Sequence, residues 1–138
     1  MVSLIRQHGA AALMAGMAAL LGGLSTAALA ATPAELLAGY SAEAGVRAEP
    51  ARGQAFFTQR HGQEWACASC HTAQPTQAGK HAATGKTIAP MAPAVNAERF
   101  TDLAKTEKWF RRNCKDVVGR ECQANEKADV LAWLMTLK

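Results

Sequence analysis

The stretch CASCH, from Cys67 to His71, decides what kind of domain this 138-residue chain forms. It has the pattern Cys-x-x-Cys-His, which is typical of covalent haem attachment. Two thiols three residues apart lie on one face of a helical turn, so Cys67 and Cys70 can each form a thioether with one porphyrin. The next residue, His71, then directs its imidazole to the iron as the proximal ligand. We therefore expect one covalently bound haem c.

Two other uses of a Cys-x-x-Cys pair fit the surrounding sequence less well. A thioredoxin-like dithiol is expected after a strand, and no strand pattern precedes Cys67. A zinc site needs a second pair of ligands at matching spacing, whereas Cys114 and Cys122 are eight residues apart.

The sequence around the motif predicts an all-α domain. Four stretches carry helical signals, at 32–45, 48–60, 98–114 and 124–138, and among them Thr32 followed by Glu35 has the pattern of a capping box. The expected N-cap of the third is Asp102 or Thr101, and Gly45 and Gly119 are expected to end helices.

The middle of the chain, residues 61–93, consists mostly of Gly, Pro, Thr, Gln and Ala, and no alternating strand pattern is visible there or elsewhere. A long irregular loop in a small domain needs something to organise it, and a large apolar cofactor would do so. Gly53 followed by Phe57, together with LAWL at 131–134, resembles the crossing helices of class I cytochromes c. The expected architecture is therefore a class I cytochrome c-like helical domain around one haem.

The N-terminus predicts export. Arg6 precedes an apolar, glycine-interrupted run, and ALA at 28–30 is a small-x-small cleavage signal. The run is short and glycine-rich for a transmembrane span. We expect a signal peptide at 1–30 and a cytochrome domain at 31–138, located in the periplasm. In that oxidising space, cysteines without another use tend to form a disulfide.

The formal charge of +4 falls to +3 once Arg6 is removed with the signal peptide. Because the excess is small and basic residues do not alternate with aromatic ones, binding to nucleic acid is not expected. The basic residues that could steer an acidic partner or pair with cofactor carboxylates cluster in one region: Lys105, Lys108, Arg111, Arg112, Lys115 and Arg120. For a chain of this size a monomer is the default expectation.

The residues alone leave the sixth iron ligand open among four candidates: His61, His81, Met91 and Asn113. His61 lies in a Gly/Gln turn, and His81 is only ten residues past His71, a short path to the opposite haem face. Met91 lies between Pro90 and Pro93 and can ligate iron or pack on the haem. Asn113 follows His71 by 42 residues, which suits a segment that wraps to the distal side.

Three stretches resemble a known family: GKTIAPMAP at 85–93, NAERFTDLAKTEKWFRRNCKDVVGREC at 96–122 and EKADVLAWL at 126–134. They are similar to the small monohaem cytochromes of the sphaeroides haem protein type and to their relative cytochrome c-double-prime. The resemblance covers most of residues 31–138. One departure is Met91, at a position where relatives of this type carry Leu.

The resemblance implies roles for three further residues. In the family the residue just before the first distal cysteine is the sixth ligand of ferric iron, which implies Asn113 here, and the two distal cysteines form a disulfide, which implies a Cys114–Cys122 bond. The ligand leaves on reduction, and the ferrous iron then binds small diatomic molecules. An Asn side chain is a neutral ligand, a hard donor through its oxygen or a weak donor through its amide nitrogen. Ferrous iron is softer than ferric iron, so a labile bond to it is chemically reasonable.

Three functions are therefore weighed. The first is an electron-transfer cytochrome with Asn113 as a labile ligand that opens the iron to O₂ or NO. The second is a plain low-spin carrier with His71 and Met91 as ligands. The third is a haem enzyme that reduces oxygen, peroxide or NO, for which Arg111, Arg112 and Lys115 are the nearest candidates, although a solvated surface explains them better. By resemblance, the redox partners would be another c-type cytochrome and a membrane b-type cytochrome.

Overall fold

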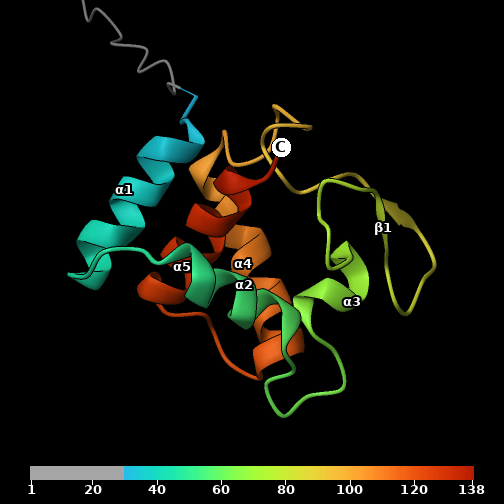
Figure 1. Cartoon of the computed structure of the whole chain (residues 1–138). Helices are drawn as coiled ribbons and strands as arrows, with labels where there is room; N and C mark the ends of the chain where they lie inside the picture. The colour runs from blue at the N-terminus through green and yellow to red at the C-terminus, as the bar shows by residue number, and fades with distance from the viewer. Residues whose placement is uncertain (1–29) are drawn as a thin grey trace, which may run out of the picture.

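The computed structural model describes residues 30–138, so the signal peptide expected at 1–30 lies almost wholly outside the described residues. Within this part of the chain the fold is helical, as predicted, and Figure 1 shows the arrangement. The helices are α1 Pro33–Ala44, α2 Pro50–Thr58, α3 Cys67–His71, α4 Leu103–Val118 and α5 Ala124–Thr136. None of them is both long enough and apolar enough to cross a membrane.

The helix ends follow from local sequence. Thr32 caps α1 by accepting a hydrogen bond from the backbone N–H of Glu35, and the Glu35 carboxylate accepts one from the backbone N–H of Thr32, which completes the predicted capping box. Asp102 caps α4 through the N–H of Lys105. Gly45 and Gly119 end α1 and α4 in left-handed conformations, with φ of 65° and 76°.

The third predicted helix starts after its expected N-cap and ends later than expected. It begins at Leu103, directly after the expected N-cap Asp102, but continues past Cys114 to Val118. Phe100 has φ of 58°, so the backbone cannot run as a regular helix through it. Its buried ring joins the core, which accounts for this unusual conformation in a bulky residue.

The prediction that no strand is present was wrong in one place. Strands β1 Gly79–Lys80 and β2 Thr87–Ile88 pair antiparallel, with Gly79 opposite Ile88. Two-residue strands are too short to show an alternating pattern, so the sequence carried no signal for them. The resulting hairpin lies beside α3 (Figure 1).

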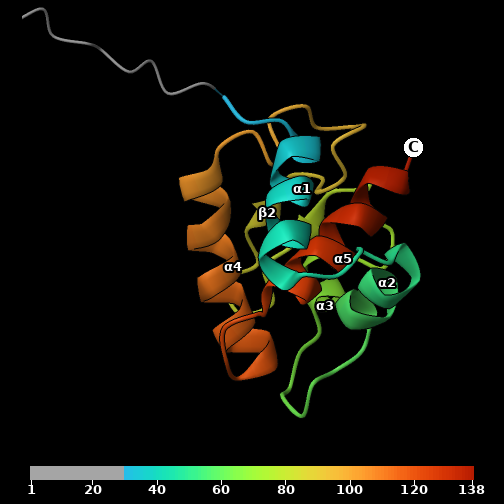
Figure 2. The ribbon, with the colours of Figure 1, turned by 90° about the vertical axis from the view of Figure 1, so that its left-hand side faces the viewer.

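Helix α5 is the centre of the core, packed closely against α1 and α2 (Figure 2). The α2–α5 crossing is tight, because a Cβ atom on Gly53 would overlap the backbone carbonyl of Asp129. Phe57 of α2 lies against Trp133 of α5, with ring centroids 5.0 Å apart. The crossing predicted from Gly53, Phe57 and LAWL is therefore present.

Helix α4 stands further from the other helices than α1 or α2 does from α5 (Figure 2). Side chains tie its first half to the core: Tyr40 donates to the Glu107 carboxylate at 2.6 Å, and Lys127 pairs with the same carboxylate at 2.7 Å. The Tyr40 ring also meets Phe110 edge-on, 6.0 Å between centroids. A disulfide between Cys114 and Cys122 ties its last turns to the segment before α5.

Candidate functional site

The thiols of the Cys-x-x-Cys-His motif lie on the short helix α3. Cys67 and Cys70 are both free and half-buried, one helical turn apart. Ser69 holds the start of this turn, because its hydroxyl accepts a hydrogen bond from the N–H of Ala66 at 3.0 Å. Burial raises the pKa of the Cys67 thiol to about 11. Two adjacent thiols on a helical turn are suited to bridging one edge of a porphyrin.

His71 ends α3, and its ring faces the inside of the molecule. The imidazole lies 6.2 Å from the buried ring of Phe57, centroid to centroid. Burial, together with the smaller effect of the positive charge of Arg99, lowers the pKa of His71 to about 4. A neutral imidazole is the form that ligates a metal ion, so His71 is held in the state that an axial ligand needs.

The loop after His71 folds back over α3. A Cβ atom on Gly79 would overlap the carbonyl oxygen of Cys70, so strand β1 approaches the motif as closely as only glycine allows. Further along, the N–H groups of Met91 and Ala92 both donate to the carbonyl of Pro75, at 2.8 and 3.1 Å. These contacts organise a segment that composition alone predicted to be irregular.

Arg99 is a functional candidate that the sequence did not single out. Its guanidinium is half-buried and donates to the carbonyls of Pro90, at 2.9 Å, and Ala89, at 2.7 Å. Asn96 donates to the same Pro90 carbonyl at 3.0 Å. Burial lowers the pKa of Arg99, and within residues 30–138 no carboxylate forms an ion pair with it.

Arg99 therefore provides the test of whether the site fits a haem. A half-buried cation without a protein carboxylate is suited to the propionates that a haem carries. Two free thiols and a neutral imidazole on α3 would supply the attachment and the axial ligand. This donor set fits a covalently bound haem. The sequence signal for Arg99 was weak, because its role depends on carbonyls nine and ten residues earlier in the chain.

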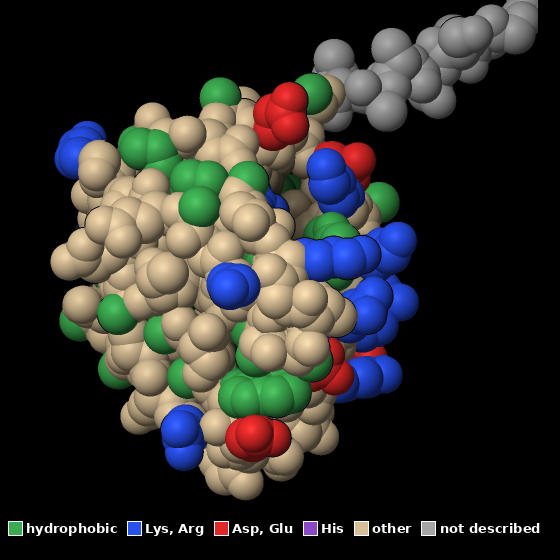
Figure 3. Space-filling model, turned by 90° about the vertical axis from the view of Figure 1, so that its right-hand side faces the viewer, with side chains coloured by type: hydrophobic (Ala, Val, Ile, Leu, Met, Phe, Trp, Pro, Cys, Tyr) green, Lys and Arg blue, Asp and Glu red, His purple; other side chains and the backbone are tan. Residues whose placement is uncertain are grey.

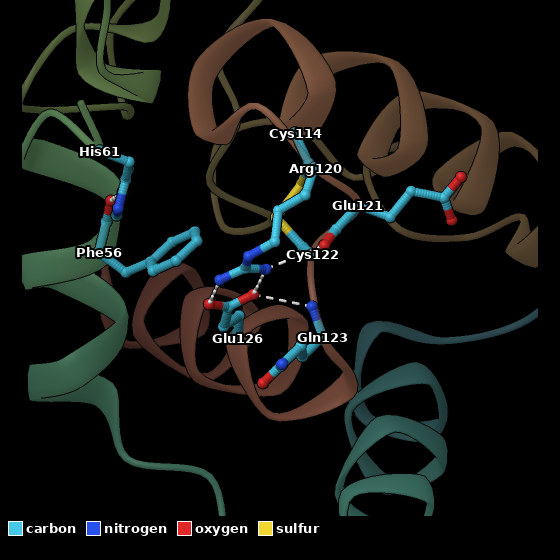
Figure 4. Close-up of polar contacts among 8 residues, drawn as sticks. All are labelled: Phe56, His61, Cys114, Arg120, Glu121, Cys122, Gln123 and Glu126. Atoms are coloured by element: carbon cyan, nitrogen blue, oxygen red, sulfur yellow. Dashed lines mark hydrogen bonds and ion pairs between the residues drawn. A yellow bond between two sulfur atoms is a disulfide. The ribbon is translucent and has the colours of Figure 1, made fainter. Parts of the chain in front are cut away.

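The structure separates the four candidates for the sixth ligand by their surroundings. The His61 ring is hydrogen-bonded through Nε2 to the backbone carbonyl of Phe56 at 2.8 Å. It also lies against the Phe56 ring, with the two ring centroids 4.3 Å apart (Figure 4). His81 is exposed in the hairpin turn, where its Nδ1 accepts from the N–H of Thr84. Met91 is half-buried against the core. The two histidines are thus engaged in local loop contacts.

Asn113 lies on the inward side of α4. It is half-buried and shares the helix face of Thr106, Phe110 and Val117, which are seven, three and four residues away from it. Within the described residues its side chain makes no hydrogen bond, unlike a capping Asn. Because none of the unpartnered side-chain amide atoms among the described residues is fully buried, the Asn113 amide is accessible and free of a protein partner.

The residue after Asn113 is one half of the disulfide. Cys114 and Cys122 are buried, and their Cα atoms are 5.6 Å apart. Beside the bond, Arg120 forms two hydrogen bonds to the Glu126 carboxylate, at 2.6 and 2.8 Å, and the N–H of Gln123 donates to it as well (Figure 4). The backbone on both sides of the turn is therefore fixed. Because Cys114 and Cys122 are bonded to each other, they do not complete a zinc site with Cys67 and Cys70.

Comparisons with known proteins agree with this geometry. Residues 43–134 match the family model described as a domain of unknown function (DUF1924). Over 107 residues the chain is 51% identical to the cytochrome c-type protein SHP of Cereibacter sphaeroides, covering 75% of this chain and 82% of that protein. Over 88 residues it is 47% identical to cytochrome c'' of Methylophilus methylotrophus, covering 61% of each.

Solved structures of the same two proteins share the fold. The structure of oxidized SHP, described as an oxygen-binding cytochrome c, aligns with a TM-score of 0.73 and 48% identity, covering 78% of this chain and 98% of that one. Oxidized cytochrome c'' from Methylophilus methylotrophus aligns with a TM-score of 0.69 and 38% identity, covering 77% and 94%.

Proposed function

The chain belongs to the SHP-type family of c-type cytochromes, related to cytochrome c'', and from this premise we propose that it is a periplasmic monohaem electron carrier with Asn113 as a labile iron ligand. Its cofactor is covalently bound haem c. Cys67 and Cys70 would hold it by thioethers, His71 would be the proximal ligand and Arg99 would pair with a propionate. When bound, the haem supplies a redox-active iron with two axial positions.

The observation that carries the proposal is the position of Asn113. Asn113 is half-buried on the helix face that also carries buried Thr106 and Val117, its side chain has no hydrogen-bond partner among the described residues, and it directly precedes a disulfide-bonded cysteine. A neutral amide is a weaker donor to ferrous than to ferric iron, so Asn113 should leave on reduction. Its departure frees a position for a small molecule such as O₂ or NO, in keeping with the oxygen binding named for SHP.

The disulfide supports this role mechanically. With Cys114 fixed to Cys122, the backbone next to Asn113 stays in place while the side chain moves. A ligand that swings on a fixed backbone can return on oxidation without refolding of the helix. Export through a signal peptide ending near Ala30 would place the chain in an oxidising space in which this bond persists. We also expect the protein to be a monomer.

The test compares two variants by optical spectroscopy in both oxidation states. Asn113→Ala should make the ferric haem high-spin, because the axial donor is lost. Asn125→Ala is the matched control, since Asn125 is also half-buried in a helix and makes no side-chain hydrogen bond among the described residues. Reduced wild type should be high-spin and should shift on addition of CO. A ferric spectrum of Asn113→Ala identical to wild type would refute the ligand assignment.

One observation favours a second function, a plain low-spin carrier with Met91 as sixth ligand. Met91 is half-buried and packs against the core, so its thioether is in an interior position. Met91→Leu keeps nearly the same volume and removes the sulfur. If Met91 were the ligand, this variant alone would abolish the ferric charge-transfer band of methionine-ligated haem. A haem enzyme has less support, because Arg111, Arg112 and Lys115 are all exposed on α4.

A further inference from the structure

The net charge of the described chain is concentrated on one helix. Residues 30–138 contain 14 basic and 11 acidic side chains, a net charge of +3. Helix α4 alone contains five basic and two acidic residues, which is also +3. The remaining nine basic and nine acidic residues cancel. The molecule is therefore an electric dipole whose positive end is α4.

Four of the five cations of α4 form a single stripe, which we call the α4 stripe: Lys105, Lys108, Arg112 and Lys115. Their spacing of three, four and three residues places them above one another on one side of the helix. All four are exposed. In Figure 3, Lys and Arg side chains are gathered in a column along the right-hand edge of the molecule, on the side where α4 runs.

The charges of the α4 stripe are largely unneutralised. Of the two carboxylates on the helix, Glu107 turns to the core, where Tyr40 and Lys127 bind it. Lys115 forms an ion pair with Glu121 at 3.5 Å, but both side chains are about 60% exposed, so the pair contributes little. Within the described residues, no carboxylate pairs with Lys105, Lys108 or Arg112.

An exposed aromatic ring borders the α4 stripe on the side of Asn113. Trp109 is 44% exposed, and the Arg112 guanidinium lies 5.8 Å from the centre of its ring. Trp109 precedes Asn113 by four residues, so the two side chains are neighbours along the helix. Tryptophan and arginine are the residues that most often contribute large binding energies at protein interfaces.

We propose that the α4 stripe, with Trp109, is the docking surface for an acidic redox-partner protein that donates one electron. In this step the partner is oxidised by one electron and the iron is reduced from ferric to ferrous. The inference rests on the proposed electron-carrier function. It places the partner beside the same helix that carries Asn113, so electron entry and ligand release occur on one side of the molecule. A complementary acidic surface would be steered to the positive end of the dipole.

The experiment measures reduction of the ferric holoprotein by reduced flavodoxin, an acidic one-electron donor, in a stopped-flow instrument at several ionic strengths. The test variant is Lys105→Glu/Lys108→Glu/Arg112→Glu. The control variant, Arg47→Glu/Arg60→Glu/Lys138→Glu, changes the net charge equally at three exposed positions away from α4. At low salt we expect the test variant to react at least about tenfold more slowly than wild type, and the control within about twofold. Added salt should slow wild type and remove the difference.

Trp109→Ala provides a second variant that leaves the charge unchanged. It should slow reduction severalfold at every salt concentration, because it removes contact area rather than steering. Equal slowing of the two charge variants, or no slowing of either, would overturn the proposal. A membrane role would also overturn it. In that case wild type and the control variant would bind anionic phosphatidylglycerol vesicles, the α4 triple variant would not, and its rate of reduction by flavodoxin would equal that of wild type.

Reduction by dithionite separates this inference from the proposed function. All variants should be reduced by dithionite and should show wild-type spectra, because none of the changed residues is a ligand. A protein that dithionite cannot reduce would refute the electron-carrier function itself. Normal reduction by dithionite with equal flavodoxin rates would refute only the docking surface.

Discussion

Replacing both cysteines of the disulfide, as Cys114→Ala/Cys122→Ala, is expected to destabilise the fold and loosen Asn113 together. The bond has a sequence separation of 8 and closes a loop of about nine residues. Loop-closure entropy for that length corresponds to about 2.6 kcal/mol at 25 °C. For a domain near 100 residues, a loss of this size lowers the melting temperature by about 10 °C or more.

The same loss should appear at the iron. Without the disulfide, the last turns of α4 are attached to the rest of the chain mainly through buried Val117 and the exposed Lys115–Glu121 pair. The upper limit applies if the disulfide stabilises only the backbone position from which Asn113 reaches the iron. Its loss would then shift the equilibrium toward dissociation of Asn113 from ferric iron by up to about 70-fold, since 1.4 kcal/mol is a factor of ten. The ferric spectrum should therefore contain a larger high-spin fraction.

Two measurements check this prediction: thermal unfolding followed by circular dichroism, and ferric spectra recorded well below the melting temperature. Val117→Ala is the matched control, because it removes about 1.6 kcal/mol of burial from the same helix without cutting a covalent link. The control should lower the melting temperature but leave the ferric spin state unchanged. If the cysteine variant has the ferric spectrum of wild type, or if Val117→Ala shifts the spin state equally, the disulfide does not hold the ligand.

Three further predictions follow from the fold and the haem site. Gly53→Ala should destabilise the domain by about 1–3 kcal/mol in denaturant unfolding, because the added Cβ atom meets the Asp129 carbonyl. The control Gly39→Ala has open space around the added atom and should be neutral or slightly stabilising. Equal stabilities of the two variants would contradict the tight crossing. Burial by itself raises the pKa of Glu107, but hydrogen bonds from Lys127 and Tyr40 outweigh it and lower the pKa below 4.5. The stability that the Glu107 carboxylate contributes is present above pH 4.5 and is lost as the pH falls through the lowered pKa. The stability of Glu107→Gln should therefore decrease less on acidification than that of wild type. Identical pH profiles of stability for the two proteins would count against this role of Glu107. Arg99→Gln should lower the reduction potential by tens of millivolts in a redox titration, because a half-buried positive charge near the haem favours the ferrous state; about 59 mV corresponds to a tenfold change for one electron. Arg99→Lys keeps the charge and should shift the potential less. A potential unaffected by either change would remove Arg99 from the site.

The parts of this fold that depend on local sequence could be predicted. Thr32 with Glu35, Asp102 and Gly119 act through neighbours within four residues, so their patterns identified the helix ends correctly. The short helix α3 is equally local, since Cys67, Cys70 and His71 lie together in the predicted helical turn.

The parts that depend on distant contacts could not be predicted. The left-handed conformation of Phe100 before α4 could not be predicted, because it accompanies burial of this residue in the core and not a local sequence signal. Gly79 faces the carbonyl of Cys70, nine residues earlier, and Arg99 binds carbonyls at 89 and 90, so neither role leaves a periodic signal. The half-buried position of Asn113 beside Phe110 and Val117 on α4 also needed the structure, because the residues alone left four candidates for the sixth ligand open.

The burial of Cys67 has a consequence for the order of assembly. A thiol reacts as its thiolate, and a pKa of about 11 leaves very little thiolate at neutral pH in the folded chain. Strand β1 also lies directly on the backbone of Cys70, which restricts access to the motif from that side. Thioether formation should therefore precede the closing of the hairpin, so attachment would take place while this part of the chain is still unfolded. Folding would then be completed on a polypeptide already joined to its cofactor, and a chain that closed the hairpin first would expose its thiols poorly to haem.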